Sequence, residues 1–431
     1  MHNWLAALAQ QATPDIDECV RVLGPALPLL QAFERTPQDA QWHAEGNVHI
    51  HTGMVLAELY ALLQDEAKHI QGRQRQALIL GTMLHDIAKP LCTREKEIRG
   101  RICVVSPRHG DVGRDYLAYR LMEFPLPYDV VETVLALVGE HSKPTKLVLT
   151  DASAGQYRAV ARRVDHELLY WLERADMQGR ICADADQQME RLALFRLFSE
   201  EYQAWHQSRL NQDWKNALHD ALQAFDPDQQ DLIYANAIRE READSMFCPE
   251  EALAKPYAHQ TTFPKLVVVC GPSGAGKSTW IKTHLPHYEV VSLDHIREQL
   301  CGQRAVQKHK GKVMHAAKDQ LRAHLRNHGN VVWDATNLRK AFRDSICDLG
   351  FAYKALVTLV VFQPAITALQ HDNRNRTHPV PNMVLQKQID QLEWPTVSDA
   401  HRFLVIGEQG RVLRYHGAMH SLAEDACLPA F

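Results

Sequence analysis

KLVVVCGPSGAGKSTWI, residues 265–281, combines a β-branched apolar run, a glycine-rich turn and the expected start of a helix. This order is the context in which a G-x-x-x-x-G-K-S sequence holds phosphates. The glycines let backbone N–H groups converge on an anion, and the N-terminus of the helix adds favourable partial charge. We therefore predict a nucleotide-binding loop, in preference to the alternative of a turn that merely needs glycine.

The predicted loop offers side-chain ligands as well as backbone donors. Lys277 would reach the β- and γ-phosphates of ATP, and the hydroxyl of Ser278 would bind Mg²⁺. Asp334, which follows the hydrophobic run in VVWDATN, could support the Mg²⁺ ion or its water. The expected ATP and Mg²⁺ contacts are Gly271, Ser273, Gly274, Ala275, Gly276, Lys277, Ser278, Thr279 and Asp334.

Short β-branched runs alternate with helix-length segments from Lys265 onward. Apolar runs in this order predict a parallel sheet that is buried on both faces. The runs are KLVVVC (265–270), YEVVSLD (288–294), GNVVWDAT (329–336) and ALVTLVVF (355–362). Residues 265–431 are therefore expected to form a P-loop α/β domain.

Residues 1–225 show a different pattern, in which apolar residues recur at intervals of three and four, as amphipathic helices require. HTGMVLAELYALL and RQALILGTMLHDIA are examples, whereas RICVV (101–105) predicts a short strand or a buried turn. The expected fold class is two-domain α and α/β. An all-α domain over 1–225 would be joined to the α/β domain by a polar linker over 226–264 that contains one helix.

The composition is that of an ordinary globular protein, with 45% hydrophobic and 23% charged residues among 431. Its net charge of −4 provides no global positive field for nucleic acid, although a local basic groove is compatible with it. Nine cysteines without a CxxC pair argue against zinc ribbons and a disulfide framework. The sequence has no secretory leader pattern and no run of 18 apolar residues, so we expect a cytoplasmic protein without a membrane segment.

Two carboxylates follow predicted strands. Asp294 comes after the second apolar run, with Arg297 three residues later. An aspartate at the carboxyl end of a strand points into the crevice where ligands bind in open α/β sheets, and there it could accept a proton from an attacking hydroxyl. The alternative is a helix N-cap with a solvated arginine. Asp334 could likewise only cap the helix expected at LRKAFRDSI, and for Asn337 we favour that capping role.

A third element is the segment HDNRNRTHPVP, which brings Arg374 and Arg376 together with His378 ahead of a proline break. Arginines on a segment above the phosphates can offset the charge that develops in a transition state. A charged helix face is the alternative for either arginine.

Together these residues resemble the polynucleotide kinase family of P-loop phosphotransferases. The resemblance rests on GPSGAGKS, the pair Asp294-x-x-Arg297, DATN at 334–337 and NRNRTHPVP. It implies that Asp294 is the general base for a 5′-hydroxyl and that Arg297 contacts a phosphate of the acceptor strand. Arg374 or Arg376 would be the lid arginine on the donor phosphates.

An adjacent pair, His85 and Asp86, occurs inside the apolar pattern GTMLHDIAKP. Burying such a pair is costly unless something compensates, and a metal ion is the usual remedy. Any one histidine elsewhere in the sequence is better explained by a core or surface role, but this pair provides a centre that others can join. Mixed imidazoles and carboxylates suit Mn, Fe, Co, Ni or Zn better than Ca. The candidates to join it are His51, His109, His141 and Asp176.

The order His…His-Asp…His…His…Asp resembles the HD superfamily of metal-dependent phosphohydrolases. The runs RHGDVGRD, VGEHSKP and ADMQGR are similar to the HD domain attached to bacterial CCA-adding tRNA nucleotidyltransferases. The resemblance implies that one divalent metal is bound by His51, His85, Asp86 and Asp176. His109 and His141 would bind a second metal or the scissile phosphate. Further candidates for phosphate contact are His43, Lys89 and Lys143.

The two halves together resemble the bacterial HD-Pnk family of nucleic-acid end-healing enzymes. This implies that the C-terminal domain transfers the ATP γ-phosphate to a 5′-OH end of RNA or DNA. The HD domain would hydrolyse 2′,3′-cyclic phosphate or 2′-phosphate ends, which prepares both ends for a ligase. Two alternatives stay open: an HD nucleotidase fused to a small-molecule or nucleoside kinase, and a non-catalytic ATP-dependent switch on a helical scaffold.

Overall fold

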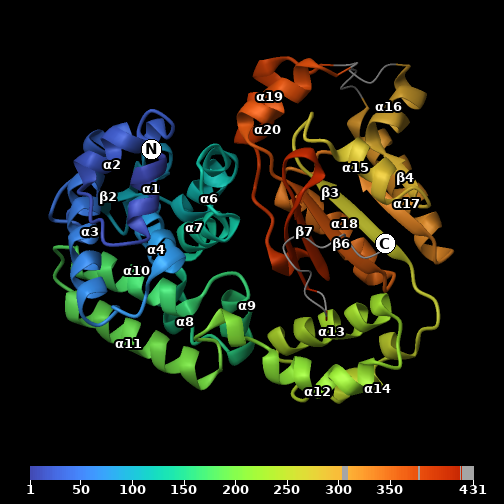
Figure 1. Ribbon diagram of the computed structural model, residues 1–431, viewed down its shortest axis with the longest axis horizontal. Helices are drawn as coiled ribbons and strands as arrows, with labels where there is room; N and C mark the ends of the chain where they lie inside the picture. Colours follow the sequence, from blue (N-terminus) through green and yellow to red (C-terminus); the bar gives the residue numbers. More distant parts are fainter. Residues whose placement is uncertain (303–308, 377–378, 418, 420–431) are drawn as a thin grey trace. The chain divides into compact units, whose positions relative to one another are not determined.

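The computed structural model describes residues 1–302, 309–376, 379–417 and 419. The chain divides into two compact units, Met1–Leu210 and Asn211–Phe431. Figure 1 colours the first unit from blue to green and the second from yellow-green to red. Among the described residues, no helix is both long and apolar enough to cross a membrane.

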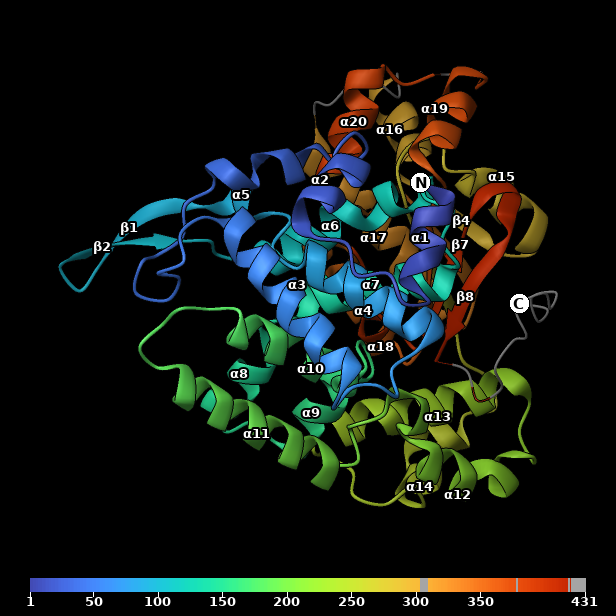
Figure 2. The same cartoon turned by 60° about the vertical axis from the view of Figure 1, so that its left-hand side comes forward.

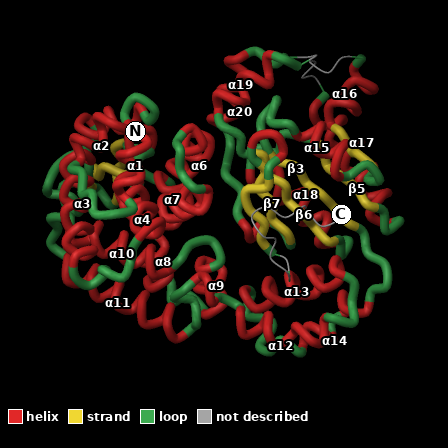
Figure 3. Tube along the Cα trace, viewed as in Figure 1, coloured by secondary structure: helices red, strands yellow, loops and turns green. Residues whose placement is uncertain are grey.

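The first unit is helical, as the spacing of its apolar residues predicts (Figure 3). α3 (Val48–Gln64) and α4 (Gly72–Leu84) are the helices expected from HTGMVLAELYALL and RQALILGTMLHDIA. Every residue from Arg75 to Leu84 is buried, because α4 is surrounded by other helices. The other helices of this unit are α1 (His2–Leu8), α2 (Ile16–Leu23), α5 (Lys89–Cys92), α6 (His109–Arg120), α7 (Tyr128–Glu140), α8 (Lys143–Leu149), α9 (Ala154–Ala161), α10 (His166–Gln178) and α11 (Ala185–Glu201).

Two glycines allow helices of this unit to approach closely. α4 packs against α7, where a Cβ added at Gly81 would lie 2.8 Å from the side chain of Leu137. α10 packs against α3, where a Cβ at Gly179 would lie 2.7 Å from the backbone nitrogen of Val55. Both distances are shorter than van der Waals contact, so any larger residue would push the helices apart.

A β-ribbon interrupts the helices of the first unit. β1 (Arg94–Ile98) and β2 (Arg101–Val105) pair in antiparallel register. The two residues between them, Arg99 and Gly100, have φ values of 52° and 79°, as a tight hairpin turn requires. Figure 2 shows the ribbon reaching out from the helices of its own unit. Of the two alternatives for RICVV, the structure therefore contains the strand.

The second unit is built on a sheet with the strand order β4-β5-β3-β6-β7-β8 among the described residues. The first four strands in sequence coincide with the predicted runs, and neighbours among them pair in parallel, which confirms the predicted α/β class. β7 (Arg402–Ile406) extends the sheet in parallel, and β8 (Val412–His416) pairs with it in antiparallel. These two strands were not predicted. The confirmed strands are β3 (Lys265–Cys270), β4 (Glu289–Ser292), β5 (Asn330–Asp334) and β6 (Leu356–Phe362).

Helices link the parallel strands, as such a sheet requires. α17 packs against β4 and β5, and α18 packs against β3 and β6. The helices that follow β3 are α15 (Lys277–His284), α16 (Leu293–Cys301), α17 (Lys310–Arg326), α18 (Lys340–Ala352), α19 (Ile366–Arg374) and α20 (Asn382–Asp390).

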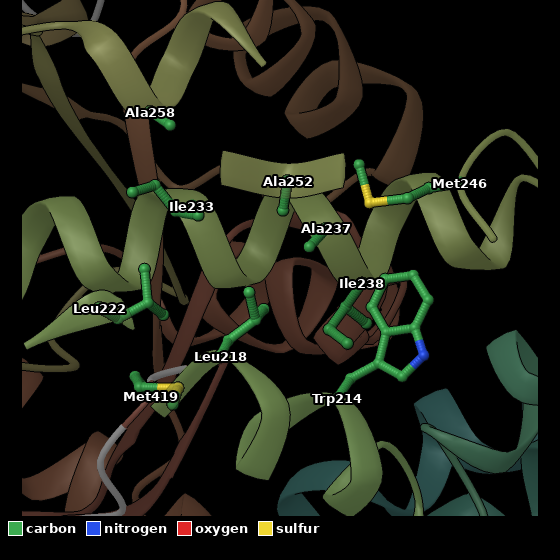
Figure 4. Close-up of a cluster of buried hydrophobic side chains, with 10 residues drawn as sticks. All are labelled: Trp214, Leu218, Leu222, Ile233, Ala237, Ile238, Met246, Ala252, Ala258 and Met419. Carbon is green, nitrogen blue, oxygen red and sulfur yellow. The ribbon is translucent and has the colours of Figure 1, made fainter. Parts of the chain in front are cut away.

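The predicted linker 226–264 contains α13 (Pro227–Glu242) and α14 (Glu251–Ala254). Together with α12 (Gln212–Leu222), these helices surround a hydrophobic cluster of their own (Figure 4). The helix expected in this segment is therefore part of a packed layer of the second unit. The cluster consists of Trp214, Leu218, Leu222, Ile233, Ala237, Ile238, Met246, Ala252, Ala258 and Met419.

Ion pairs attach α13 to the amino ends of the strands. Arg402, the first residue of β7, is buried and contacts Asp228 at 2.7 Å and Asp231 at 2.5 Å. Asp228 also pairs with Lys265, the first residue of β3. Asp231 accepts a further hydrogen bond from the backbone N–H of Met419, at 2.6 Å. The helix layer is thereby joined to the edge of the sheet opposite the glycine-rich loop.

We predict that Asp231→Ala at pH 7 lowers the free energy of unfolding of the second unit by about 3 kcal/mol, because it removes one partner of a buried ion pair. Urea unfolding of the full chain measures the shift. Asp220→Ala removes an exposed carboxylate from neighbouring α12 and should change the free energy by less than about 0.5 kcal/mol. Equal shifts in the two variants would contradict the role given to the buried pair.

Candidate functional site

The glycine-rich loop joins β3 to α15, which begins at Lys277. Gly274 and Gly276 have φ values of 87° and 86°, in the left-handed region that favours glycine. The ammonium group of Lys277 donates to the carbonyl oxygens of Gly271 at 2.9 Å and Pro272 at 2.6 Å. The loop therefore curls around its own lysine.

A cavity of about 440 Å³ lies over this loop. It collects residues that follow β3, β4 and β5, because the carboxyl ends of parallel strands share one edge of a sheet. Its walls contain Ser273, Gly274, Gly276, Lys277, Ser278, Thr279, Leu293, Asp294, Arg297, Asp334, Ala335, Thr336, Asp372, Asn375 and Arg376.

Charge inside this cavity is only partly balanced. Burial lowers the pKa of Lys277 to about 8, and the neighbouring carboxylate of Asp334 opposes that shift. Burial also raises the pKa of Asp334, which Lys277 opposes. A bound phosphate would neutralise the positive charge of Lys277, and a divalent cation would neutralise the negative charge of Asp334. Both groups therefore suit a metal–nucleotide complex.

Asp294 and Arg297 form an ion pair on the first turns of α16. Their closest atoms, Oδ1 of Asp294 and a terminal nitrogen of Arg297, lie 2.5 Å apart. The Asp294 side chain is 68% exposed, against 16% for Arg297, so the carboxylate is accessible from solvent. Ser292 occupies the N-cap of α16, which rules out the capping alternative for Asp294.

The two arginines considered for the lid differ in position. Arg376 lines the phosphate cavity, whereas Nε of Arg374 donates to the carbonyl oxygen of Gln370 at 3.3 Å, along its own helix. α20 also contacts the glycine-rich loop: the amide oxygen of Gln388 accepts a hydrogen bond from the backbone N–H of Ser273 at 2.8 Å. His378 lies outside the described residues.

The capping role favoured for Asn337 is wrong. α18 begins at Lys340 with Arg339 at its N-cap. Asn337 is buried instead, where its Nδ2 donates to the carbonyl oxygen of Val269 at 2.5 Å and its Oδ1 accepts from Nε1 of Trp333 at 3.2 Å. Its amide thus joins the ends of β3 and β5, which is why it cannot serve the helix.

In the first unit, the predicted metal ligands meet around Asp86. Nε2 of His51 lies 3.0 Å from Oδ1 of Asp176 and 3.8 Å from Oδ2 of Asp86. Nε2 of His85 lies 3.3 Å from the same Asp86 oxygen and 3.8 Å from Oδ1 of Asp176. All four side chains are buried, so α3, α4 and α10 bring together the set that the sequence indicated.

The other two histidines approach the opposite oxygen of Asp86. Nε2 of His109, at the start of α6, lies 3.2 Å from Oδ1 of Asp86. Nε2 of His141, at the end of α7, lies 2.9 Å from Nε2 of His109. The Asp86 carboxylate therefore lies between two groups of nitrogen atoms, one on each side.

The histidines are oriented by their outer nitrogens. Nδ1 of His85, His109 and His141 donates to the carbonyl oxygens of Thr82, Ser106 and Val138, at 2.7, 2.7 and 2.8 Å. A carbonyl oxygen can only accept, so in each neutral ring Nε2 is unprotonated and faces the centre. His51 is held in the same way by Glu45, whose carboxylate lies 2.9 Å from Nδ1.

Electrostatics favours a cation at this centre. Burial alone would raise the pKa of Asp86, but the charges of His85 and Lys89 hold it well below its ordinary value. The pKa of Asp176 is likewise held well below its ordinary value, against the effect of burial, by Arg180 and His51. Burial, reinforced by His109 and His85, lowers the pKa of His141 to about 3, so that ring is neutral at pH 7. Asp86 and Asp176 raise the pKa of His85 against the effect of burial. The centre therefore combines two ionised carboxylates with a neutral His141 ring.

These observations fit a transition metal. Among the described residues, Nε2 of His51 and Nε2 of His85 are buried without a hydrogen-bond partner. An unprotonated nitrogen facing a carboxylate oxygen at 3.0 Å is repelled unless a proton or a cation lies between them. Two groups of potential ligand atoms share Asp86, one with His51 and His85 and one with His109 and His141. Nitrogen and carboxylate ligands of this kind suit Mn, Fe, Co, Ni or Zn.

A cavity of about 610 Å³ opens onto this centre. The ammonium group of Lys89 contacts Asp86 at 2.7 Å, and His43 shares the carboxylate of Glu45 with His51. Lys143 contacts Glu140 at 3.7 Å instead. The walls contain Gln38, Asp39, Trp42, His43, His85, Asp86, Lys89, Val104, Ser106, His109, His141, Ser142, Thr145, Lys146, Leu149, Thr150, Glu173, Asp176, Met177 and Arg180.

Several residues that support these two sites were not predicted from the sequence. Arg180 pairs with Asp176 and lies inside the quoted run ADMQGR, and Glu45 orients His51 from six residues earlier in the chain. Lys146 lines the cavity one helical turn after Lys143. Gln388 had no local signal, because its partner Ser273 lies more than 100 residues away in the chain.

Residues 266–395 match a family of known proteins, the AAA domain family. The match begins in β3 and ends after α20, so it includes every described residue that lines the phosphate cavity. The second unit thus contains a kinase-like P-loop domain, which implies ATP as a ligand.

Three solved structures resemble part of this chain. A chain of the Pnkp1/Rnl/Hen1 RNA repair complex is 21% identical over 32% of this chain and 47% of its own, with a TM-score of 0.29. A chain in a second structure of the Pnkp1/Rnl/Hen1 complex is 24% identical over 28% of this chain and 42% of its own, with a TM-score of 0.26. A gluconokinase from Sinorhizobium meliloti 1021 is 22% identical over 34% of this chain and 85% of its own, with a TM-score of 0.27.

The chain therefore spans less than half the length of the two repair-complex chains. Similarity at this level carries no conclusion about a substrate. No curated protein matches the chain.

Proposed function

We propose that this chain heals broken nucleic-acid ends with two activities. The second unit would transfer the γ-phosphate of ATP to a 5′-OH polynucleotide end, and the first would hydrolyse 2′,3′-cyclic phosphate or 2′-phosphate ends. The observation that carries the proposal is the occurrence in one chain of two such sites. One is a P-loop cavity with an accessible carboxylate, and the other is a buried His/Asp centre at the floor of a cavity.

In the kinase reaction, the loop and Lys277 would hold the donor phosphates. Ser278 and Asp334 would hold Mg²⁺, which neutralises phosphate charge when bound. The Asp294 carboxylate would accept the proton of the attacking hydroxyl, since it is exposed and lines the same cavity. Arg297 forms an ion pair with that carboxylate and would contact a phosphate of the acceptor.

In the phosphoesterase reaction, the residues of the first unit would position the phosphate and the water. His51, His85, Asp86 and Asp176 would bind one metal, and His109 and His141, with Asp86, a second. The bound metal supplies an activated water and a Lewis acid for the phosphoryl oxygens. Lys89 and Lys146, which line the cavity, would offset the charge of the phosphate.

The two activities are chemically complementary. Cleavage of RNA by attack of a 2′-hydroxyl leaves a 2′,3′-cyclic phosphate on one fragment and a 5′-OH on the other. A ligase that joins a 3′-OH to a 5′-phosphate would need both ends repaired. A metal-dependent phosphoesterase and a 5′-kinase in one chain would meet that need.

We predict that His51→Gln lowers the amount of Mn²⁺ or Co²⁺ retained by the protein, because Nε2 of His51 faces two buried carboxylates. Elemental analysis after loading and desalting measures it. His49→Gln is the matched control: His49 lies two residues away on α3 and contacts the exposed carboxylate of Asp17 at 2.9 Å. Equal retention by the wild type and both variants would contradict a metal centre at Asp86.

The two activities should be separable by mutation. We expect Lys277→Ala to abolish transfer of labelled γ-phosphate to a 5′-OH oligonucleotide and to leave cyclic-phosphate hydrolysis intact. Asp86→Ala should have the reverse effect, because it removes the carboxylate shared by both groups of histidines. Label transfer and hydrolysis are measured on the same preparations. Transfer to small-molecule acceptors but not to oligonucleotides would refute the polynucleotide assignment, and loss of both activities in one variant would refute independent sites.

The two lid arginines should differ in effect. We predict that Arg376→Ala lowers the rate of label transfer on the order of 10³-fold, as loss of an arginine from a phosphoryl-transfer site does. Arg374→Ala, whose guanidinium contacts its own helix, should change the rate by less than about tenfold. Single-turnover transfer with saturating ATP separates the chemical step from binding. A larger loss in the Arg374 variant would reverse the assignment.

A further inference from the structure

The cavity around Asp86 has a buried floor and an exposed mouth. His85, Asp86, His141 and Asp176 on its walls are at most 4% exposed, whereas Trp42 is 43% and Leu149 is 63% exposed. The metal-ligand centre therefore forms the floor, and Trp42 and Leu149 lie toward solvent. A volume of about 610 Å³ is within the range of sites for whole small molecules, so the cavity has room for more than a phosphate group.

We propose that Trp42 forms a nucleobase subsite at this mouth and stacks on the base of the nucleotide whose phosphate lies at the floor. The proposal rests on the proposed phosphoesterase function and adds the substrate group recognised there. The occupant is the base of the terminal nucleotide of a nucleic acid strand.

The loop that carries Trp42 is held in place by Asp39. The backbone N–H groups of Trp42 and His43 donate to the Asp39 carbonyl oxygen at 3.1 and 2.9 Å. The Asp39 carboxylate accepts from the backbone N–H of Val104 at 3.0 Å and from the guanidinium of Arg101 at 3.2 Å. Both of these donors belong to β2, so the ribbon fixes one side of the loop.

The other side of the loop is tied to the metal-ligand centre. His43, the next residue after Trp42, has its ring centroid 4.7 Å from that of His51. Both rings contact the carboxylate of Glu45, whose second oxygen accepts the backbone N–H of Ile181 at 2.9 Å. Neighbouring Cα atoms are 3.8 Å apart. Because Trp42 directly precedes His43, its backbone therefore lies near the ring of His51.

An exposed tryptophan held in this way differs from a chance surface residue. Isolated exposed apolar side chains are common and need no function, but this one lines a cavity and its backbone is fixed on both sides. Because the backbone of Trp42 is already held in place, a stacking partner would have to order only the indole side chain. Stacking between a base and an aromatic side chain tolerates any base, because every base has a π-face.

The chemistry of the remaining walls matches a nucleotide. Val104, Leu149 and Met177 provide apolar surface, and Lys89 and Lys146 provide positive charge. A nucleotide offers a planar ring at one end and phosphate at the other, so it would contact both kinds of wall. A substrate that lacks a ring would leave Trp42 without a partner.

The test compares two probes that differ only in the base. The 2′-phosphonomethyl analogue of 2′-deoxyadenosine carries it, and the same analogue of methyl ribofuranoside does not; in both probes a CH₂ group replaces the 2′ ester oxygen, so that the proposed activity cannot hydrolyse them. Dissociation constants are measured by calorimetry in Mn²⁺ buffer with the full chain carrying Lys277→Ala, so that the phosphate loop of the second unit contributes little. We expect Trp42→Ala to weaken binding of the adenosine probe on the order of tenfold. Binding of the abasic probe should not change.

Two further variants control the result. Trp42→Phe keeps an aromatic face and should restore most of the affinity for the adenosine probe. Ile102→Ala removes a side chain that is 68% exposed on β2 and should change neither dissociation constant. Equal weakening of both probes by Trp42→Ala would overturn the subsite, because Trp42 would then only support the loop. Unchanged binding of the adenosine probe would overturn it as well.

The proposed phosphoesterase activity is tested separately, by hydrolysis of adenosine 2′,3′-cyclic phosphate by the same proteins. If the subsite is correct, Trp42→Ala raises the KM of this substrate and leaves kcat unchanged. Absence of hydrolysis in the wild type would refute the activity, while a base-dependent dissociation constant would still establish the subsite. Hydrolysis with no dependence on the base would establish the activity and refute the subsite.

Discussion

The buried carboxylate of Asp86 is the charge on which the arrangement of the first unit depends. A carboxylate inside a helical core is tolerated only where positive charge or a metal compensates it. Here His51 and His85 approach one oxygen, and His109 approaches the other. These ligands come from different helices, so the helices must pack closely around one point. The close approaches at Gly81 and Gly179 are consistent with that requirement.

In the second unit, the buried charged residues lie at the two opposite ends of the parallel strands. At the carboxyl ends, the glycine-rich loop and Lys277 form a site for phosphate, and burial brings the pKa of Lys277 down to about 8 until an anion arrives. At the amino ends, Arg402 and Lys265 pair with carboxylates of α13. These pairs are satisfied within the fold, so that edge is structural. The unsatisfied charge lies at the opposite edge, where a ligand would bind.

Local patterns in the sequence were sufficient for much of this fold. The strands β3, β5 and β6 were predictable because each contains a continuous apolar run that is buried. β4 was predicted from its two valines, although only Val291 is buried in this edge strand. β7 and β8 were missed, although each is as long as β5. β8 pairs antiparallel at the edge of the sheet and is only half-buried, so it lacks the continuous apolar run of the central strands. The role of Asn337 was mispredicted because its amide bonds to Val269, which is distant in sequence. A helix cap is a local feature, whereas this contact exists only after β3 and β5 pair.

The sequence by itself determined which groups can do chemistry: the lysine and glycines of the loop, the adjacent His85 and Asp86, and the carboxylates after the strands. Their spacing carries this information because each motif is completed within one turn or one strand end. Only the tertiary structure decided which residues share a site. It placed Arg376 in the phosphate cavity and Arg374 on its own helix, and it brought Glu45 to His51 and Trp42 to the mouth of the cavity. Such contacts join separate elements, and their geometry follows from packing, which no short stretch of sequence encodes.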